Sequence, residues 1–320
     1  MFTILKQLLK PLIRETEHAL WLMLERSKLL TPATTAYLKE NNLQRLLTLQ
    51  ALHGYIYGRW TKHYINLARN VLGPMFYDFR SLYKNWFANR YHCKVLTQEH
   101  AEAIINLDQE IPLQDLERVI PYSKARELVL NAPPAIAVID CVCRQTRPNG
   151  CEPKKVCMII GQPFVDLILE YHKEGRRVSQ QEALKILREE HERGHVHLAY
   201  FKDACLDRFY AICNCCSCCC GGIEAMMKYD IPMIAASGYV AKVEEEKCKA
   251  CGKCVKICPF GALAIGECSS SVTVDWDACM GCGVCMSQCP SDALTLLRDI
   301  GKGVPLDVNE LVTTTYASIS

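Results

Sequence analysis

Apolar positions at the start of the chain recur three or four residues apart, at Leu5, Leu8, Leu9, Leu12 and Ile13. This period predicts a helix that Pro11 interrupts or kinks. A second periodic stretch covers residues 18–30. The chain is therefore expected to open with two helices.

Helix-start and helix-stop signals continue this pattern. In the pair Thr31-Pro32, the threonine is an expected N-cap and the proline fits the first turn of a further helix. Another helix is predicted over residues 61–72, since Gly73-Pro74 follows it. Short helices are expected over residues 97–130. We therefore assign residues 1–130 to a helical region.

Between residues 131 and 235 the pattern changes to alternating strands and helices. Residues 135–139 form a short apolar run that is typical of a strand. Ser179 and Glu182 have capping-box spacing, which predicts a helix that ends near Gly194. Residues 195–200 are again typical of a strand. We expect an α+β middle domain, and the α+β class for the whole chain.

The end of this predicted helix contains a formal H-E-x-x-H match, from His191 to His195. A zinc protease needs both histidines on one face of a continuous helix. Gly194 is an expected helix C-cap, and a strand is predicted to begin directly after it. The two histidines are therefore not expected to share a helical face, and we interpret the match as chance.

Near the C-terminal end, two runs with the spacing C-x2-C-x2-C-x3-C-P repeat 31 positions apart. The first run contains Cys248, Cys251, Cys254 and Cys258, and the second contains Cys279, Cys282, Cys285 and Cys289. The neighbouring residues align as well, which indicates an internal duplication. A pair of zinc sites fits poorly, since zinc is usually bound by two separated C-x2-C pairs.

These runs resemble a bacterial-type two-[4Fe–4S] ferredoxin domain over residues 240–298, and we assign residues 236–300 to such a domain. In two-cluster ferredoxins the fourth cysteine of each run binds the cluster of the other run. The resemblance implies one cluster held by Cys248, Cys251, Cys254 and Cys289, and a second held by Cys279, Cys282, Cys285 and Cys258. Residues 301–320 are expected to form a tail.

A further set of cysteines follows the first predicted strand of the middle domain, at Cys141, Cys143, Cys151 and Cys157. A turn at Pro148-Asn149-Gly150 could bring Cys151 back toward the C-x-C pair. The four thiols could then surround one metal centre, although no standard zinc spacing matches.

Six more cysteines crowd into eight positions, at Cys213, Cys215, Cys216, Cys218, Cys219 and Cys220. In an extended chain the side chains of 216, 218 and 220 would lie on one side and those of 213, 215 and 219 on the other. Gly221-Gly222 then opens a predicted helix, whose positive N-terminal end suits an anionic thiolate cluster. Cys205 could supply one ligand more.

We hypothesise that the middle domain binds one or two further iron–sulfur clusters, through the first four of these cysteines and four of the last six. Sharing of clusters between the two segments, as in the ferredoxin repeats, is an open alternative. Two further alternatives remain open: a zinc site beside a cluster, and redox-active dithiols in residues 215–220. The combination of C-x-C-R with C-N-C-C-x-C-C-C resembles an extension found in ferredoxin-like proteins of anaerobes. That resemblance implies no defined activity.

Composition and charge indicate the compartment in which the protein is expected and the surfaces it offers. The 21 cysteines have metal-ligand spacings, and no secretory signal is visible, so a reducing cytoplasm is expected. No apolar run reaches the roughly 20 residues that span a bilayer. Residues 1–95 carry 14 Lys and Arg against 5 Asp and Glu, whereas the rest of the chain carries 23 against 30. The basic part is rich in aromatic residues between positions 55 and 91.

This basic, aromatic region has three interpretations: a helical domain with its own core, a docking surface for a redox partner protein, and peripheral membrane attachment. Nucleic-acid binding is not expected, because no recognition motif accompanies the charge.

The chain lacks a G-x-G-x-x-G fingerprint, a phosphate-binding loop and a Ser/His/Asp arrangement. We therefore expect a non-catalytic electron-transfer protein or subunit, which relays single electrons between a redox partner, such as a flavoprotein, and an acceptor. Alternatives are a reductase subunit with an unusual catalytic cluster or dithiol in residues 141–220, and a redox sensor or cluster-delivery factor.

Overall fold

The computed structural model describes residues 23, 30–40, 49–72, 74–75, 81–113, 116, 119–123, 127–266 and 270–317. The two helices predicted at the start of the chain lie outside these ranges, apart from residues 23 and 30. No helix within the described ranges is both long enough and apolar enough to cross a bilayer.

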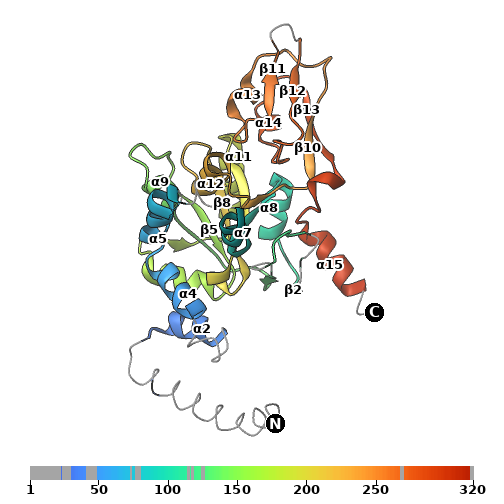
Figure 1. Ribbon diagram of the computed structural model, residues 1–320. Coiled ribbons are helices and arrows are strands. Elements are labelled where there is room, and N and C mark those ends of the chain that lie inside the picture. Colours follow the sequence, from blue (N-terminus) through green and yellow to red (C-terminus); the bar gives the residue numbers. More distant parts are fainter. Residues whose placement is uncertain are drawn as a thin grey trace, which may run out of the picture.

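A seven-stranded sheet forms the centre of the molecule (Figure 1). In spatial order its strands are β6 (Arg176–Arg177), β4 (Ile136–Asp140), β5 (Lys155–Ile160), β8 (Arg208–Cys215), β7 (Val196–Lys202), β1 (Tyr91–Leu96) and β9 (Ile234–Ala235). Neighbouring strands are antiparallel except β1 and β9, which pair in parallel.

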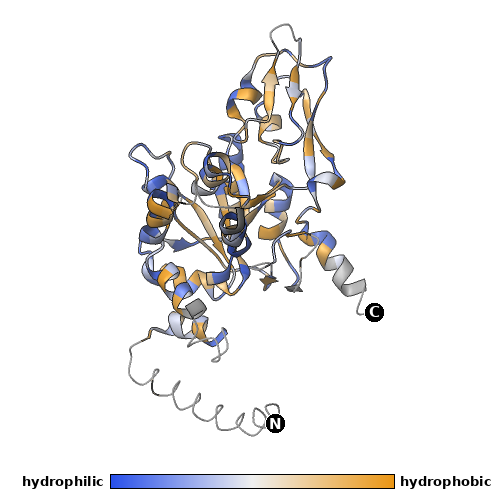
Figure 2. Ribbon diagram, viewed as in Figure 1, coloured by the Kyte–Doolittle hydropathy of each residue, from blue (hydrophilic) through white to orange (hydrophobic). Residues whose placement is uncertain are grey.

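Helices cover both faces of this sheet, because its strands carry apolar side chains on both sides. One face packs under α2 (Pro32–Glu40), α4 (Leu49–Arg59), α10 (Phe164–Tyr171) and α12 (Gly221–Tyr229). The other face packs under α8 (Gln98–Ile105) and α11 (Gln180–Glu192). Figure 2 shows the apolar strands enclosed between helices whose outer surfaces are more polar. The α+β class is confirmed at this level, as mixed helices and strands.

Several predictions for the basic N-terminal region hold. Helix α2 starts at Pro32, and the Thr31 hydroxyl accepts a hydrogen bond from the Thr34 backbone N–H (3.3 Å). The helix predicted over residues 61–72 is α5 (Thr61–Leu67), which continues as a π-helix, η1 (Ala68–Leu72). Helix α7 (Ser81–Arg90) then leads into the sheet.

The expectation of short helices over residues 97–130 is correct only for α8, since β2 (Ile111–Leu113) and β3 (Leu128–Leu130) form an antiparallel pair. Strand β1 was also missed, and it pairs along its whole length with β7. Its sequence contains His92 and Lys94, which are almost fully buried, so the strand lacks an apolar signal. The described part of the basic region thus shares a sheet with the middle domain.

The elements predicted in the middle domain are present. Strand β4 follows the two prolines, and Ser179 caps α11 by accepting a hydrogen bond from the Glu182 N–H (3.2 Å). The helix ends at Glu192, Gly194 has a positive φ of 82°, and β7 begins two residues later. His195 therefore lies outside the helix, as expected, and the H-E-x-x-H match is chance.

The C-terminal domain repeats one small unit, at the top of Figure 1. Its elements are β10 (Tyr239–Val243), α13 (Lys253–Ile257), β11 (Leu263–Ile265), β12 (Val272–Val274), α14 (Val284–Ser287) and β13 (Leu294–Arg298). Strand β10 pairs with β13, and β11 pairs with β12. We call the seven-stranded sheet and the helices that cover it the main body. After η3 (Ile300–Lys302) the chain returns to the main body, where α15 (Val308–Ala317) contacts α8.

The C-terminal domain is packed firmly against the main body. Phe260, Met280, Cys282 and Val284 belong to the same hydrophobic cluster as the sheet face under α12. The Gln288 side chain donates to the Glu192 carbonyl at the end of α11 (2.8 Å). Buried apolar contacts and a hydrogen bond therefore fix the orientation of the two parts.

Candidate metal centres

The eight cysteines of the C-terminal repeat gather around two small pockets. One pocket is lined by Cys248, Cys251, Cys254 and Cys289, which we call the distal ring. The other is lined by Cys279, Cys282, Cys285 and Cys258, which we call the proximal ring. Each pocket takes three cysteines from one run and the fourth from the other.

Backbone N–H groups point at sulfur in the same way in both repeats. The N–H of Ala262 donates to the Sγ of Cys258, and the N–H of Ala293 donates to the Sγ of Cys289, both at 3.3 Å. Such donors stabilise thiolates and the anionic clusters that thiolates hold. The residues present therefore fit two [4Fe–4S] clusters.

The rings differ in their surroundings. Cys279, Cys282 and Cys285 of the proximal ring are buried, and Cys282 is part of the hydrophobic cluster shared with the main body. In the distal ring Cys251 is exposed. The proximal ring thus faces the sheet, and the distal ring lies nearer to solvent.

A family model described as 4Fe-4S binding domain matches residues 241–264 and 272–295. Residues 241–295 are therefore an iron–sulfur domain with two repeats, and its presence indicates iron–sulfur electron transfer. None of the curated proteins compared matches the chain.

The ten cysteines of the middle domain separate into two groups, and each group combines cysteines from both segments of the sequence. The larger group, which we call the six-cysteine group, consists of Cys141, Cys143, Cys157, Cys213, Cys215 and Cys220. The smaller group, the compact group, consists of Cys151, Cys216, Cys218 and Cys219. The expectation that Cys151 joins Cys141, Cys143 and Cys157 is wrong, because the turn after α9 (Val142–Gln145) carries Cys151 to residues 216–219.

The expected alternation of the second set is also wrong beyond Cys215. Strand β8 ends at Cys215, and residues 217–219 form a turn, so the side chains no longer alternate. Cys216, Cys218 and Cys219 lie together in this turn. Cys220 is the N-cap residue of α12 and returns to the six-cysteine group.

Period-two geometry brings the six-cysteine group together on one face of the sheet. Cys213 and Cys215 lie two residues apart on β8, and their side chains share the face that carries Ala211. On the neighbouring strand β5, Cys157 lies two residues before Ile159 on that face, and its Sγ is 3.6 Å from that of Cys213. Cys141 directly follows β4, the next strand along.

The remaining members complete a continuous series of sulfur contacts. The Sγ atoms of Cys215 and Cys220 are 3.2 Å apart. Cys143 is within hydrogen-bond range of Cys220 and of Cys141. The N–H of Gly221, at the start of α12, donates to the Sγ of Cys143 (3.4 Å), so the positive end of this helix faces the thiols.

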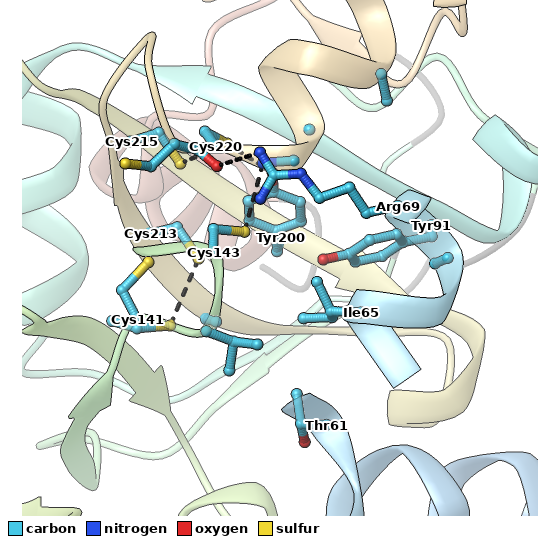
Figure 3. Close-up of a pocket in the computed structure, with 18 of the residues that line it drawn as sticks. Thr61, Ile65, Arg69, Tyr91, Cys141, Cys143, Tyr200, Cys213, Cys215 and Cys220 are labelled. Atoms are coloured by element: carbon cyan, nitrogen blue, oxygen red, sulfur yellow. Dashed lines mark hydrogen bonds between the residues drawn. The ribbon is translucent and has the colours of Figure 1, made fainter. Parts of the chain in front are cut away.

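These six thiols line a cavity of about 120 Å³ (Figure 3). Figure 3 shows five of these side chains converging beside Tyr200, while Arg69 reaches toward them from η1. The five are Cys141, Cys143, Cys213, Cys215 and Cys220. Arg69 donates to the carbonyl of Cys219 (3.0 Å) and pairs with Glu224 (2.6 Å). The cavity is large enough for a group bigger than a single ion, and its thiols are ligands that iron–sulfur clusters use.

A buried ionic network lies behind the cysteines. Arg144, the arginine of the C-x-C-R motif, is 1% exposed and donates to Glu190 (2.6 Å) and to the Asn214 carbonyl (3.1 Å). Burial alone would raise the pKa of Glu190, but hydrogen bonds from His195 and Arg144 outweigh it and hold that pKa below its ordinary value. The guanidinium charge of Arg144 also acts on Cys141 and Cys216, one from each group.

Sequence reasoning missed the aromatic part of the site. Tyr57, Tyr91, Tyr200 and Tyr210 are buried or half-buried and line the cavity, and the hydroxyls of Tyr57 and Tyr210 are 2.7 Å apart. These tyrosines lie close to cations in the sequence, but nothing in the sequence shows that α4 and the strands meet at one cavity. Cys205, considered as a ligand, is buried in η2 (Asp203–Cys205) and does not line this cavity.

Proposed function

We propose that the protein relays single electrons from a reduced redox partner, through two [4Fe–4S] clusters in the C-terminal domain, to a further iron–sulfur centre in the six-cysteine cavity. The eight cysteines of the distal and proximal rings are the ligands of the first two clusters. The six-cysteine group supplies the ligands of the third.

One observation carries this proposal: a single hydrophobic cluster joins the proximal ring to the cavity. It includes Cys282 and Met280 on the ferredoxin side, and Cys215, Cys220 and Met233 on the cavity side. Dry, closely packed side chains between redox centres lower the dielectric response and exclude water. This packing supports direct transfer between the two parts of the chain.

The test is an anaerobic redox titration of the whole protein, followed by electron paramagnetic resonance. Two [4Fe–4S] clusters and one four-iron centre in the cavity give about twelve irons per chain, against about eight for the ferredoxin domain alone. Reduction of the distal cluster should be followed by an electron at the third centre. A content of about eight irons in protein purified without oxygen would overturn the proposal.

The basic N-terminal region is the surface that we propose for one partner. Its described helices expose several large apolar side chains, at Leu52, Trp60, Leu67, Val71, Met75, Tyr83 and Trp86. Arg59 stacks on Trp60 and Arg90 stacks on Trp86, which combines positive charge with aromatic surface. An acidic redox protein is the partner that this combination suits.

Cross-linking of the native complex, purified without oxygen, tests this surface. Partner cross-links should concentrate at Lys62 and Lys84, and added salt should weaken the complex. Cross-links confined to Lys249 and Lys253, near the distal ring, would place the partner elsewhere. Membrane attachment through the same region would appear as salt-sensitive binding to anionic vesicles without any partner.

A second candidate function is reduction of a small substrate at the cavity. It is favoured by the six thiols, two more than one cubane requires, and by the paired hydroxyls of Tyr57 and Tyr210 as proton donors. An open coordination position would distinguish this function, because a small ligand such as cyanide or azide would then change the spectrum of the third centre. An unchanged spectrum favours the relay.

A further inference from the structure

The compact group has a geometry of its own. Cys151 follows the turn after α9, whereas Cys216, Cys218 and Cys219 come from the turn between β8 and α12. Their four sulfur atoms all lie within 4.8 Å of one another. Cys151 and Cys218 are 2.9 Å apart, and Cys219 is 3.6 Å from Cys218 and 3.7 Å from Cys151.

This spacing is nearer to that of the ligands of one ion than to that of the ligands of a cluster. A tetrahedral ion with metal–sulfur bonds of about 2.3 Å places its four sulfurs about 3.8 Å apart. In a [4Fe–4S] cluster each cysteine binds a different iron, so the cluster itself holds the four sulfurs farther apart.

The same chain provides an internal reference. Among the described residues, the compact group is the one set of three or more ligand atoms at this spacing. The eight cysteines of the distal and proximal rings, whose motifs belong to four-iron clusters, form no such set there, and neither does the six-cysteine group. The compact group therefore differs from every other cysteine set that is proposed to hold iron.

The surroundings fit an anionic site at the protein surface, where Cys218 is exposed. Cys216 and Cys219 are buried, and the N–H of Cys151 points at the Sγ of Cys219 (3.5 Å). Four thiolates around a divalent ion leave two negative charges, which Arg69, through its bond to the Cys219 carbonyl, and the nearby Arg144 can offset. All four coordination positions are filled by protein, which is the pattern of structural sites.

We propose that Cys151, Cys216, Cys218 and Cys219 bind a single structural Zn²⁺ ion that fixes one wall of the six-cysteine cavity. Zinc is chosen because a tetrahedral site of four sulfurs suits it and because divalent zinc binds such ligands more tightly than ferrous iron. Cys216 and Cys219 also line the cavity, and Cys220 follows them directly. The ion thus holds the turn from which Cys220 reaches the neighbouring centre.

X-ray absorption at the zinc edge of the whole, unmodified protein tests the site directly. The expected result is about one zinc per chain with four sulfur neighbours at about 2.3 Å and no iron close by. Absence of zinc from fully iron-loaded protein would overturn the proposal, and so would a mononuclear iron–sulfur spectrum in its place.

A matched pair of variants separates this site from the proposed relay. Changes beyond the direct ligands already cost about 10- to 100-fold in metal affinity, so Cys151→Ser should lose zinc by at least that factor. Cys157→Ser, in the six-cysteine group, should lose iron and keep zinc. If Cys151→Ser instead loses about four irons while zinc is unchanged, the compact group belongs to a cluster and the zinc assignment is wrong. Iron loss in Cys157→Ser tests only the proposed relay and does not test the zinc site.

Discussion

At the scale of single residues, Arg144 shows how much of the site depends on one buried charge. Its guanidinium charge interacts with one cysteine of each group and pairs with Glu190, which is also fully buried. A buried ion pair adds little net stability as a whole, but removing one partner leaves the other charge uncompensated.

Arg144→Met should therefore destabilise the fold by about 3–5 kcal/mol, because Glu190 would remain buried without its one fully buried cation. Denaturant unfolding of the iron-loaded protein under nitrogen measures the change. Arg193 contacts the same carboxylate from a half-exposed position (3.0 Å), so Arg193→Met is the control and should cost less than about 1 kcal/mol. Equal effects of both variants would contradict the role of burial.

Lys202 is a second buried cation. Its Nζ lies 4.1 Å from the ring centre of Tyr91 and 4.7 Å from that of Tyr57. Burial lowers the pKa of Lys202 to about 8, although Asp203 and Cys205 oppose the shift. The folded state therefore binds fewer protons than the unfolded state above about pH 8, and stability should rise with pH up to about pH 10.5.

Burial lowers the pKa of Lys94 to about 8 as well, so the two lysines share this rise. Lys202→Met should remove about half of it and should stabilise the protein at pH 7 by up to about 3 kcal/mol. Unfolding free energies at pH 7 and pH 10 give the answer, with the exposed Lys185→Met as control. An unchanged pH slope in Lys202→Met would show that the lysine is not buried as a cation.

At the scale of elements, the C-terminal end of α11 is the joint between the main body and the ferredoxin domain. Gly194 has a positive φ of 82°, and a Cβ placed there would lie 2.4 Å from the Cδ1 of Ile257 in α13. A side chain at this position would therefore destabilise the protein in two ways, through the left-handed backbone conformation and through a direct clash at the interface.

Gly194→Ala should destabilise the protein and slow electron arrival at the proposed third centre, since the proximal ring would shift away from the cavity. Gly261→Ala is the matched control: it also has a positive φ, of 64°, but nothing lies within 4 Å of its added Cβ. The control should show only the backbone cost of about 1–2 kcal/mol. If both variants behave alike, the contact with Ile257 does not maintain the joint.

Elements also show what the sequence could predict. The repeated cysteine runs are local patterns with a defined partner set, so their pairing into two rings was expected before the structure. The division of the middle cysteines was not, because it depends on β4, β5 and β8 being neighbours. If residues 155–160 and 208–215 had been predicted as strands, the alternation of side chains would have placed Cys213 and Cys215 on one face of the sheet, and Cys157 could share that face. The end of β8 at Cys215 has no such local signal.

At the scale of the whole molecule, metal content links the parts. Cys254→Ala removes a buried member of the distal ring and should lower iron by about four per chain, because that cluster loses a ligand. Zinc should stay at its wild-type level, and the fold around β10 and β13 should loosen. Iron and zinc quantitation after anaerobic purification checks both. Full iron content in this variant would refute the ligand assignment of the distal ring.

The shared core between the two halves has a further consequence for how the molecule works. In many electron-transfer proteins a domain on a flexible linker moves between two redox partners, and the transfer rate depends on the length of the linker. Here the hydrophobic cluster of the sheet includes Met280, Cys282 and Val284 of the C-terminal domain. Such a domain movement would therefore expose these buried side chains to water. In the proposed relay, the rate of electron transfer should therefore depend on the distances between the metal centres and on their reduction potentials. It should not change with solvent viscosity.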